Sequence, residues 1–576
     1  MRRDETPIER PQARKPSALL AAGTPKGKGT NLFNEEAIEA IKREFDQWRR
    51  DAEAGKGEGE YMKTLYTMLG SKERIPRPLH VTPLDIADMD YLREIGLPGR
   101  GPLTTGLHPT GYRGRNFTIR PIVGFGTPED TNGRIKFLLD EGATGINIVF
   151  DLPTIQEYDS DDPYAKGQVG CCGVAIDTVE DMKTLWKDIS VKEANISLTS
   201  HYPSNSMILM AMYLVMEAVV RTSPDSLPPE AIFKLQVDNI EFLKQNVPKW
   251  NYVTYNGYNL AEAGVDEVTE IAVAFSNALQ TVEEMVTRGH DPDQFLDRMA
   301  FFWVIRNDFF AEISKMRAAR RLWYRLTRYG LGCKVQRSWW CRFHVQTSGI
   351  SLGRDEPFNN IVRSGYHALA ASLGGAQSLH VSAYDEAYSI PTEGSHLVSI
   401  RTQQILQEET GVTEVVDPMA GSFYVEYLTR VLETDILKEM DEIWDEGGLT
   451  KMIESGRLHR RIAEFSYREQ RLLDEGKISM VGSNVHRSSD VKPVEVDVFR
   501  YPEGAEERQR DKLKAIRKSR DNEAVAERLA KIRDAAERKE NLFPYVLEAV
   551  RARATEGEIA RSFKEAYGLW NARVHL

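Results

Sequence analysis

One short stretch of the chain concentrates arginines and threonines. Arg113, Arg115 and Arg120 fall within eight residues, and Thr110 and Thr118 are interleaved with them. Side chains alternate along an extended strand, so Arg113 and Arg115 are expected to share a face. Guanidinium forks and short hydroxyl groups suit phosphate oxygens. The stretch therefore indicates an anion-binding strand, with an ordinary solvated edge strand as the alternative.

A second candidate site is the segment 339–349 (WWCRFHVQTSG). With a period of two, Arg342, His344 and Gln346 lie on one face of a strand. Burying three polar side chains is costly unless partners or a ligand satisfy them. This pattern favours a ligand-binding role over a structural one.

The segment 377–386 (QSLHVSAYDE) has the same alternation. Ser378, His380 and Ser382 share a face, and Glu386 follows the predicted strand. A satisfied core histidine is the alternative reading of His380.

The segment 150–163 is acidic, with Asp151, Asp159, Asp161 and Asp162. It lacks the glycine and the closing glutamate of a calcium loop. We therefore predict turn and helix-cap roles for most of these residues and no metal site.

Short β-rich runs alternate with helical periodicity between about 116 and 400. The predicted strands are 116–126, 145–153, 172–177, 194–200, 252–257, 299–305, 339–348 and 377–384. The predicted helices include 179–189, 206–220, 267–287, 309–328 and 358–373. This repetition indicates α/β architecture with parallel strands. About eight units without a dinucleotide glycine motif predict a (β/α)8 TIM barrel, whose C-terminal strand ends would carry the chemistry.

Composition shifts divide the chain into four predicted regions. Residues 1–30 are expected to form a flexible N-terminal arm or an arm that orders on a partner. Residues 31–100 are a helical and linker region, and 101–480 are the predicted barrel with flanking helices. Residues 481–576 are a charged helical C-terminal extension, which is usually solvated but can brace a partner.

The composition excludes several classes of protein. The chain has 576 residues with 41% hydrophobic residues and a formal net charge of -11, as in ordinary acidic globular proteins. The acidic balance argues against nucleic-acid binding, and no stretch approaches the roughly 20 apolar residues of a membrane span. The four cysteines, Cys171, Cys172, Cys333 and Cys341, are predicted to be reduced core thiols. The cytoplasm is the expected location.

Ten segments, in this order, give the chain a clear family resemblance. They are RGRNFTIRPIVGFGTPEDTN (113–132), GATGINIVFDLPT (142–154), YDSDDP (158–163), GVAIDTVEDM (173–182), PKWN (248–251), GYNLAEAG (257–264), KMRAARRLW (315–323), HVQTSG (344–349), QSLH (377–380) and VDPMAGSFYVE (416–426). Over residues 100 to 480 the chain resembles the methylmalonyl-CoA mutase large-subunit family. Within it, the chain looks most like the separate large subunits of isobutyryl-CoA and 2-hydroxyisobutyryl-CoA mutases.

The resemblance implies an isomerase that carries out radical carbon-skeleton rearrangement of an acyl-CoA with adenosylcobalamin. The family's cobalt-ligating Asp-x-His-x-x-Gly motif is not found in this sequence. A separate small cobalamin-binding subunit is therefore expected to hold the cobalt in a heterotetramer, and a GTPase chaperone is a further candidate partner.

The family's functional residues match positions of this sequence. The resemblance places Thr110, Arg115, Thr118, Arg120, Arg298 and Ser378 at CoA-contacting positions, with Asn147, Ile122 and Val149 also at the substrate. It places Glu386, Gln346 and Glu262 beside the cofactor, and makes Asn259, Gln346, Glu386 and His344 the candidate catalytic residues.

Departures from the family pattern bear on the substrate. Methylmalonyl-CoA mutases have Tyr at the position of Ile122, and the 2-hydroxyisobutyryl type has a hydroxyl-binding Asp at the position of Val149. Two apolar side chains favour an apolar or branched acyl group, because an unpaired polar group is costly to bury. The chain is also about 20 residues shorter than the family between 213 and 248, by comparison of motif spacing. The segment 225–247 contains no Arg that could bind a carboxylate, which argues against methylmalonyl-CoA as the substrate.

Asn259 replaces a family histidine that donates to the thioester carbonyl. An amide can donate a hydrogen bond but cannot act as an acid. We expect either a changed substrate orientation or weakened mutase activity. The alternative function is a catalytically degenerate CoA-binding or assembly subunit. A barrel hydrolase or aldolase lacks a convincing nucleophile or metal constellation in this sequence.

Overall fold

The computed structural model describes residues 15–23, 31–54, 78, 80–189, 195–199, 227–248, 250–487 and 496–569. Its strands are β1 (Thr118–Ile119), β2 (Ile122–Val123), β3 (Gly145–Val149), β4 (Asn195–Thr199), β5 (Val253–Asn256), β6 (Met299–Ile305), β7 (Phe343–Thr347) and β8 (Ser378–His380). Every pair of these strands is parallel, so the predicted α/β class with parallel strands is confirmed. No helix in these ranges is long and apolar enough to cross a membrane.

The strands form two sheets, ordered β1-β8-β7-β6-β5 and β2-β3-β4. One continuous segment, 118–123, carries β1 into the first sheet and β2 into the second. Pro121 separates the two short strands because proline has no N–H to give to a ladder. The Arg120 N–H still donates to the Leu379 carbonyl at 2.9 Å, and the Asn147 N–H donates to the Pro121 carbonyl at 3.0 Å. This segment therefore joins the two sheets.

Two strand predictions need correction. The predicted strand 116–126 is interrupted at Pro121, and the predicted strand 172–177 is wrong. In that segment only Val174 forms an isolated bridge, with Phe150. A Cβ on Gly173 would lie 2.1 Å from the Phe150 carbonyl, so the chain crosses the end of β3 as a close-packed loop. Within the described residues β4 and β5 are not paired, and those residues do not form a closed barrel.

The register of the paired strands places several polar residues on the same face of the sheets. Thr118 pairs with Ser378, which also pairs with His344. Ile122 pairs with Asn147 on the neighbouring strand β3. Parallel strands present paired residues on the same face. Polar residues from separate sequence motifs therefore line one surface of the sheets.

The described helices of the α/β unit lie before, between and after the strands in sequence. They are α4 (Gly111–Gly114), α5 (Pro128–Asp140), α6 (Leu152–Ile155), α7 (Val179–Leu185), α9 (Pro229–Asn246), α10 (Tyr258–Glu262), α11 (Glu267–Thr287), α12 (Phe309–Arg325), α13 (Asn359–Leu373), α14 (Glu393–Glu408), α15 (Phe423–Asp445), α16 (Leu449–Glu454) and α17 (Arg457–Asp474). The predicted helix 267–287 coincides with α11, whose first turn is capped by the Asp266 side chain. The predicted helix 206–220 lies outside the described residues.

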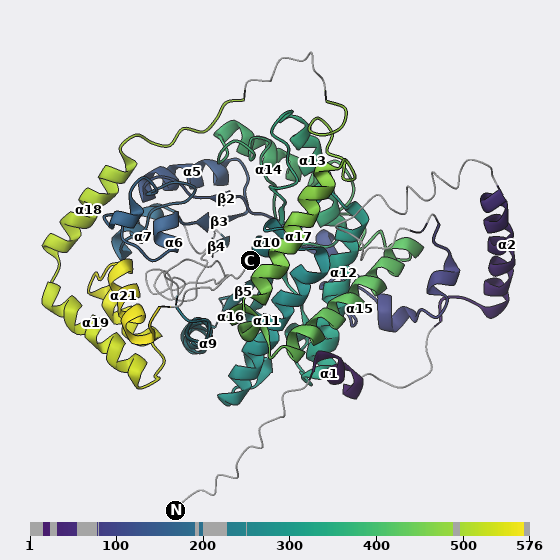
Figure 1. Cartoon of the computed structure of the whole chain (residues 1–576), viewed down its shortest axis with the longest axis horizontal. Coiled ribbons are helices and arrows are strands. Elements are labelled where there is room, and N and C mark those ends of the chain that lie inside the picture. The colour runs from purple at the N-terminus through teal and green to yellow at the C-terminus, as the bar shows by residue number, and fades with distance from the viewer. Residues whose placement is uncertain are drawn as a thin grey trace, which may run out of the picture.

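Helix α12 is buried on all sides and carries charged residues inside the core. The Lys315 ammonium lies 2.7 Å from Glu270 Oε2 and 2.5 Å from Glu312 Oε2, and all three side chains are inaccessible to solvent. Arg321 forms a second buried ion pair with Glu433 at 2.6 Å. These pairs tie α12 to α11 and α15, which pack beside it (Figure 1).

The C-terminal extension packs against the chain's own α/β unit. It contains α18 (Ala505–Ser519), α19 (Asn522–Glu537), α20 (Phe543–Arg551) and α21 (Glu556–Tyr567), which lie beside α7 and α9 (Figure 1). Arg517 pairs with Asp159 at 2.5 Å, and Gln509 donates to Asp177 at 2.8 Å. Phe543 stacks on Phe242 with ring centroids 4.1 Å apart. The charged extension therefore braces the loop that follows β3.

The part of the predicted N-terminal arm that the structure describes is docked. Helix α1 (Pro16–Gly23) buries Leu20, and Lys15 pairs with Asp445 at 2.6 Å. Residues 16–23 are therefore not a flexible arm, because an apolar side chain anchors them. Helix α2 (Glu35–Ala54) lies at the periphery, where it contacts the short helix Pro83–Ile86 (Figure 1).

All four cysteines are free thiols. Cys333 and Cys341 are buried, as predicted. Cys171 is half-buried and Cys172 is exposed, so the prediction of a core position is wrong for this pair. Both belong to the loop that crosses the end of β3, where the chain turns at the surface.

Aspartates in the acidic segment after β3 accept hydrogen bonds from backbone N–H groups. Asp151 caps α6 by accepting from the Thr154 N–H, and Asp162 accepts from the Tyr164 N–H. These contacts confirm the predicted capping role for Asp151 and Asp162, whereas Asp159 and Asp161 form ion pairs with Arg517.

Candidate active site

A cavity of about 720 Å³ opens at the N-terminal ends of the strands. Its walls include the first residue of each of four strands, β1, β4, β7 and β8. Six predicted site residues line it, namely Arg115, Thr118, Arg120, Asn147, His344 and Ser378. Motifs more than 250 residues apart in sequence thus meet in one cavity.

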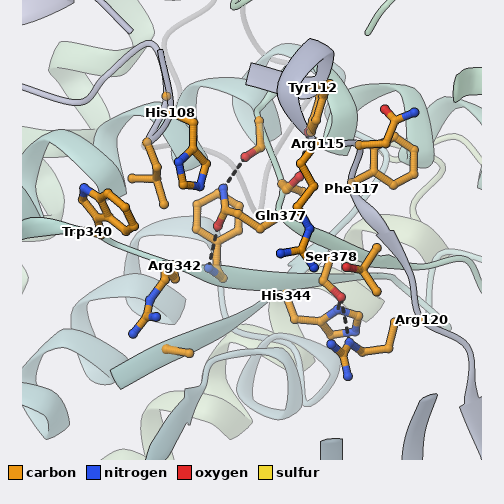
Figure 2. Close-up of a pocket in the computed structure, with 18 of the residues that line it drawn as sticks. His108, Tyr112, Arg115, Phe117, Arg120, Trp340, Arg342, His344, Gln377 and Ser378 are labelled. Carbon is orange, nitrogen blue, oxygen red and sulfur yellow. Dashed lines mark hydrogen bonds between the residues drawn. The ribbon is translucent and has the colours of Figure 1, made fainter. Parts of the chain in front are cut away.

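A hydrogen-bonded trio forms the floor of the part shown in Figure 2. Arg120 Nε donates to Ser378 Oγ at 2.9 Å, and the same hydroxyl lies 2.9 Å from His344 Nδ1. The Arg120 guanidinium also donates to the Asn195 carbonyl at 2.9 Å. A Cβ on Gly145 would lie 3.3 Å from Arg120 Cζ, so glycine leaves room for this side chain. Arg120 is 8% exposed and is held from three directions.

The His344 ring is neutral at physiological pH. Burial lowers its pKa well below the ordinary value, and the nearby Arg120 and His380 lower it further. Phe302 packs against the ring with centroids 4.8 Å apart. His344 is therefore a fixed, uncharged hydrogen-bonding group.

Aromatic and cationic side chains surround the mouth of the cavity. His108 meets Trp340 edge to face with ring centroids 5.0 Å apart, and the Arg337 guanidinium lies 5.5 Å from the Trp340 ring. Arg115 and Arg342 also reach this mouth (Figure 2). Such a mouth suits a flat base and anionic phosphates.

A second group of predicted residues lies toward the C-terminal strand ends. Gln346 Nε2 donates to the Tyr258 hydroxyl at 2.7 Å, and the Tyr258 ring stacks on Phe302. Asn259 follows Tyr258 in α10, and its N–H donates to Asn256 Oδ1 at 3.1 Å. Gln346 Oε1 is buried without a hydrogen-bond partner in the described part of the chain. That oxygen is open to a ligand.

Two carboxylates meet at Gly349, just beyond the end of β7. Glu262 Oε2 accepts from the Gly349 N–H at 3.0 Å and from the Ile350 N–H at 3.1 Å. A Cβ on Gly349 would lie 3.2 Å from Glu262 and 3.6 Å from Glu386. Burial raises the pKa of Glu386 to about 7, and the neighbouring charges of Glu262 and Asp385 add to the rise. Glu262 Oε1 is buried with no partner among the described residues.

Replacing Glu386 by glutamine is expected to raise the unfolding temperature more at pH 8 than at pH 5. The folded-state pKa of about 7 lies above the ordinary value of 4.5. Stability linked to the bound proton is therefore fully present below the unfolded pKa and is lost as pH rises through the folded pKa. An amide has no proton to lose. Thermal unfolding at both pH values checks this, and an equal gain at both would contradict the raised pKa.

Ile122 and Val149 lie on the same face of neighbouring strands. Ile122 pairs with Asn147, and Val149 is two residues further along β3. The Ile122 N–H donates to His380 Nδ1 at 3.2 Å, and burial lowers the pKa of His380 to about 3. The predicted apolar pair is thus placed on the inner face beyond Asn147.

Two predicted CoA contacts lie outside the cavity wall. Thr110 is exposed at the start of α4, and Arg298 lies 3.4 Å from the carboxylate of Asp297. Their CoA-binding role stays a prediction.

Sequence reasoning missed Phe302, Tyr258 and Ser197. Ser197 lines the cavity from β4, and the alternation in 194–200 could have found it. Phe302 stands in an entirely apolar strand, whose pattern does not distinguish the inner face from the outer one.

Comparisons of the sequence with known proteins show the family of this chain. A family model described as methylmalonyl-CoA mutase matches residues 71–227 and 217–569. The chain is 38% identical to the 2-hydroxyisobutanoyl-CoA mutase large subunit of Aquincola tertiaricarbonis, over 85% of this chain and 90% of that protein. It is 37% identical to the methylmalonyl-CoA mutase of Cereibacter sphaeroides, over 93% of this chain and 77% of that protein. The human mitochondrial methylmalonyl-CoA mutase is also 37% identical, over 82% of this chain and 65% of that protein.

These matches and the site define an enzyme class, that of the acyl-CoA mutases, which are isomerases. The chain belongs to the methylmalonyl-CoA mutase family, whose members depend on adenosylcobalamin.

Proposed function

We propose that this chain is the large subunit of an adenosylcobalamin-dependent mutase that rearranges an apolar or branched acyl-CoA. The observation that carries the proposal is the cavity in which Arg115, Arg120, His344 and Ser378 converge at the N-terminal strand ends. A buried cationic and hydrogen-bonding channel fits the phosphates and amides of CoA. A TIM barrel with the CoA arm along its axis is part of this proposal.

The residues beyond the cavity fit a polar cofactor at the C-terminal strand ends. Within the described residues, Gln346 Oε1 and Glu262 Oε1 have no hydrogen-bond donor, and Glu386 lies beside Glu262. Adenosylcobalamin, when bound, supplies the radical that starts the rearrangement. We propose that a small partner subunit holds the cobalt in a heterotetramer, with a GTPase chaperone as a further partner.

This chain's own residues bind, orient and shield the substrate. The exposed Arg115 attracts the CoA phosphates at the mouth, and the buried Arg120 anchors the CoA portion deeper in the cavity, because guanidinium groups donate strongly to anions and carbonyls. Ile122 and Val149 present an apolar wall to the acyl group and exclude water from the reacting carbons. Tyr258 and Gln346 hold each other in place beside Asn259.

Mixing the chain with its small partner, adenosylcobalamin and a panel of acyl-CoAs tests the proposal. The panel contains isobutyryl-, butyryl-, pivalyl-, isovaleryl-, 2-hydroxyisobutyryl- and methylmalonyl-CoA, with products resolved by mass. Isomerisation of an apolar member alone is expected. Turnover of methylmalonyl-CoA would overturn the apolar assignment.

The second candidate function is a catalytically degenerate CoA-binding or assembly subunit. Asn259 is the observation that favours it, because the amide occupies the position at which family members have a histidine. Binding of CoA and cobalamin without turnover of any panel member would support this candidate.

Replacing Asn259 by histidine is expected to raise kcat about 10-fold with the best panel substrate. A histidine can place a stronger donor than an amide beside the thioester, and one such donor contributes on the order of 1 kcal/mol. Steady-state kinetics of the two proteins measure the change, and Asn259→Gln serves as the matched amide control. An unchanged kcat would show that this position has little mechanistic weight.

A further inference from the structure

His344 carries a buried nitrogen without a partner. Its Nδ1 faces Ser378 and its ring packs on Phe302, but Nε2 is buried and makes no hydrogen bond in the described part of the chain. An unsatisfied buried nitrogen is costly, so a position like this one usually receives a ligand atom or a water. The ring lines the cavity, which makes a ligand the natural partner.

The contact of Arg120 with Ser378 favours one position for the ring proton of His344. The Arg120 guanidinium has only N–H donors, so Ser378 Oγ accepts from it. The hydroxyl proton is then free to bond His344 Nδ1, which lies 2.9 Å away. In this arrangement the remaining ring proton lies on Nε2. The trio presents one neutral N–H donor to the cavity.

The position of His344 along β7 selects the acceptor. Gln346 is two residues further along the strand, about 6.6 Å closer to the C-terminal end, and is bonded to Tyr258 beside Asn259. That end carries the acyl group in the proposed function. The pantetheine arm has an amide carbonyl separated from the thioester by a two-carbon spacer. This carbonyl therefore comes level with His344 when CoA enters from the mouth.

We propose that His344 Nε2–H donates a hydrogen bond to the pantetheine amide carbonyl nearest the thioester, with Arg120 and Ser378 as positioning residues. The inference rests on the proposed function, because it requires CoA in this cavity. The neutral His344 ring suits the neutral amide of the pantetheine arm. A protonated ring would instead favour a negatively charged ligand, such as the carboxylate of a free acid that is not joined to CoA. The trio thus selects for the CoA arm rather than for its acyl group.

A ligand with one altered atom tests the contact. Isobutyryl-CoA is compared with an analogue whose nearest amide is a thioamide, because sulfur accepts hydrogen bonds weakly. Calorimetry on the full chain is expected to show about a 10-fold weaker Kd for the thioamide with the wild type. The His344→Leu variant is expected to bind both ligands equally, so that the double-mutant cycle shows coupling. Ser382→Ala, a hydroxyl deletion outside the cavity wall, is the control and should keep the 10-fold difference.

The position of the His344 ring proton can be measured separately from ligand binding. Nitrogen-15 NMR of histidine-labelled chain is expected to show the Nε2–H tautomer at His344, assigned by its loss in His344→Leu. Ser378→Ala should shift the tautomer balance without unfolding the chain. An Nδ1–H tautomer in the wild type, or equal affinity of the wild type for both ligands, would overturn the inference. Failure of the wild type to bind CoA at all would instead overturn the proposed function.

Discussion

Replacing Lys315 by leucine is expected to lower the free energy of unfolding by about 3–5 kcal/mol. The Lys315 ammonium has no exposure to solvent and contacts Glu270, Glu312 and the Val304 carbonyl, the last at 2.8 Å. Removing it leaves two buried carboxylates without their direct ion-pair partner, and Arg306 is the nearby cation that still acts on both of them. Breaking such a pair costs more than forming it gains, because the remaining charges stay desolvated.

The loss of unfolding free energy in Lys315→Leu should grow as pH rises. Burial raises the pKa values of both Glu270 and Glu312, while the ammonium of Lys315 opposes that rise. Without Lys315 the two carboxyls take up protons more readily in the folded state, and that stabilising protonation is lost as pH rises through their raised folded-state pKa values. Urea unfolding at pH 6 and pH 8 measures both effects.

Lys451→Leu provides the matched control. Lys451 also contacts two glutamates, Glu230 and Glu454, but its side chain is 56% exposed. Exposed pairs contribute about 0–1 kcal/mol, so this variant should unfold almost as the wild type does. Equal losses at positions 315 and 451 would refute the view that burial sets the cost.

Replacing Val149 by aspartate is expected to change the preference between hydroxylated and apolar acyl-CoAs by about 10⁴-fold. Val149 lies on the inner face of β3, two residues beyond Asn147 and diagonal to Ile122. A carboxylate there can accept a hydrogen bond from a substrate hydroxyl. With an apolar acyl group, the same carboxylate stays buried and unpaired.

The measurement is the ratio of kcat/KM values for 2-hydroxyisobutyryl-CoA and isobutyryl-CoA in the assembled enzyme. Val149→Leu keeps the wall apolar and should leave that ratio within a few-fold of the wild type. A variant Val149→Asp that loses both activities equally would show that the residue does not face the acyl group. Isobutyryl-CoA binding by calorimetry separates that outcome from loss of the fold.

Much of the site was predictable because the types and the period-two spacing of its residues are visible in the sequence. Alternation placed His344 and Ser378 on polar strand faces, the family resemblance added Arg120, and one cavity brings the three together. Parallel strands buried on both faces are usually apolar throughout, but polar and apolar residues alternate along a strand when one of its faces lines a ligand channel. Helix α11 was predicted to the residue because an aspartate cap and an amphipathic period mark it locally.

Other features depend on contacts that no local pattern reports. The segment 172–177 has the apolar composition of a strand, yet it crosses the end of β3 as a loop that Gly173 allows. The pairing of Arg517 with Asp159 joins residues 358 positions apart. Charge runs are usually solvated, so only the folded chain shows that this one braces the loop.

The sequence by itself determined the family, the α/β class with parallel strands and the chemical character of the cavity. These properties follow from residue types and short periods, which are local. The tertiary structure decided that Ser378 joins Arg120 to His344, that Phe302 faces the cavity and that Lys315 is buried between two carboxylates. These properties depend on strand register and helix packing, which bring together atoms from distant parts of the chain.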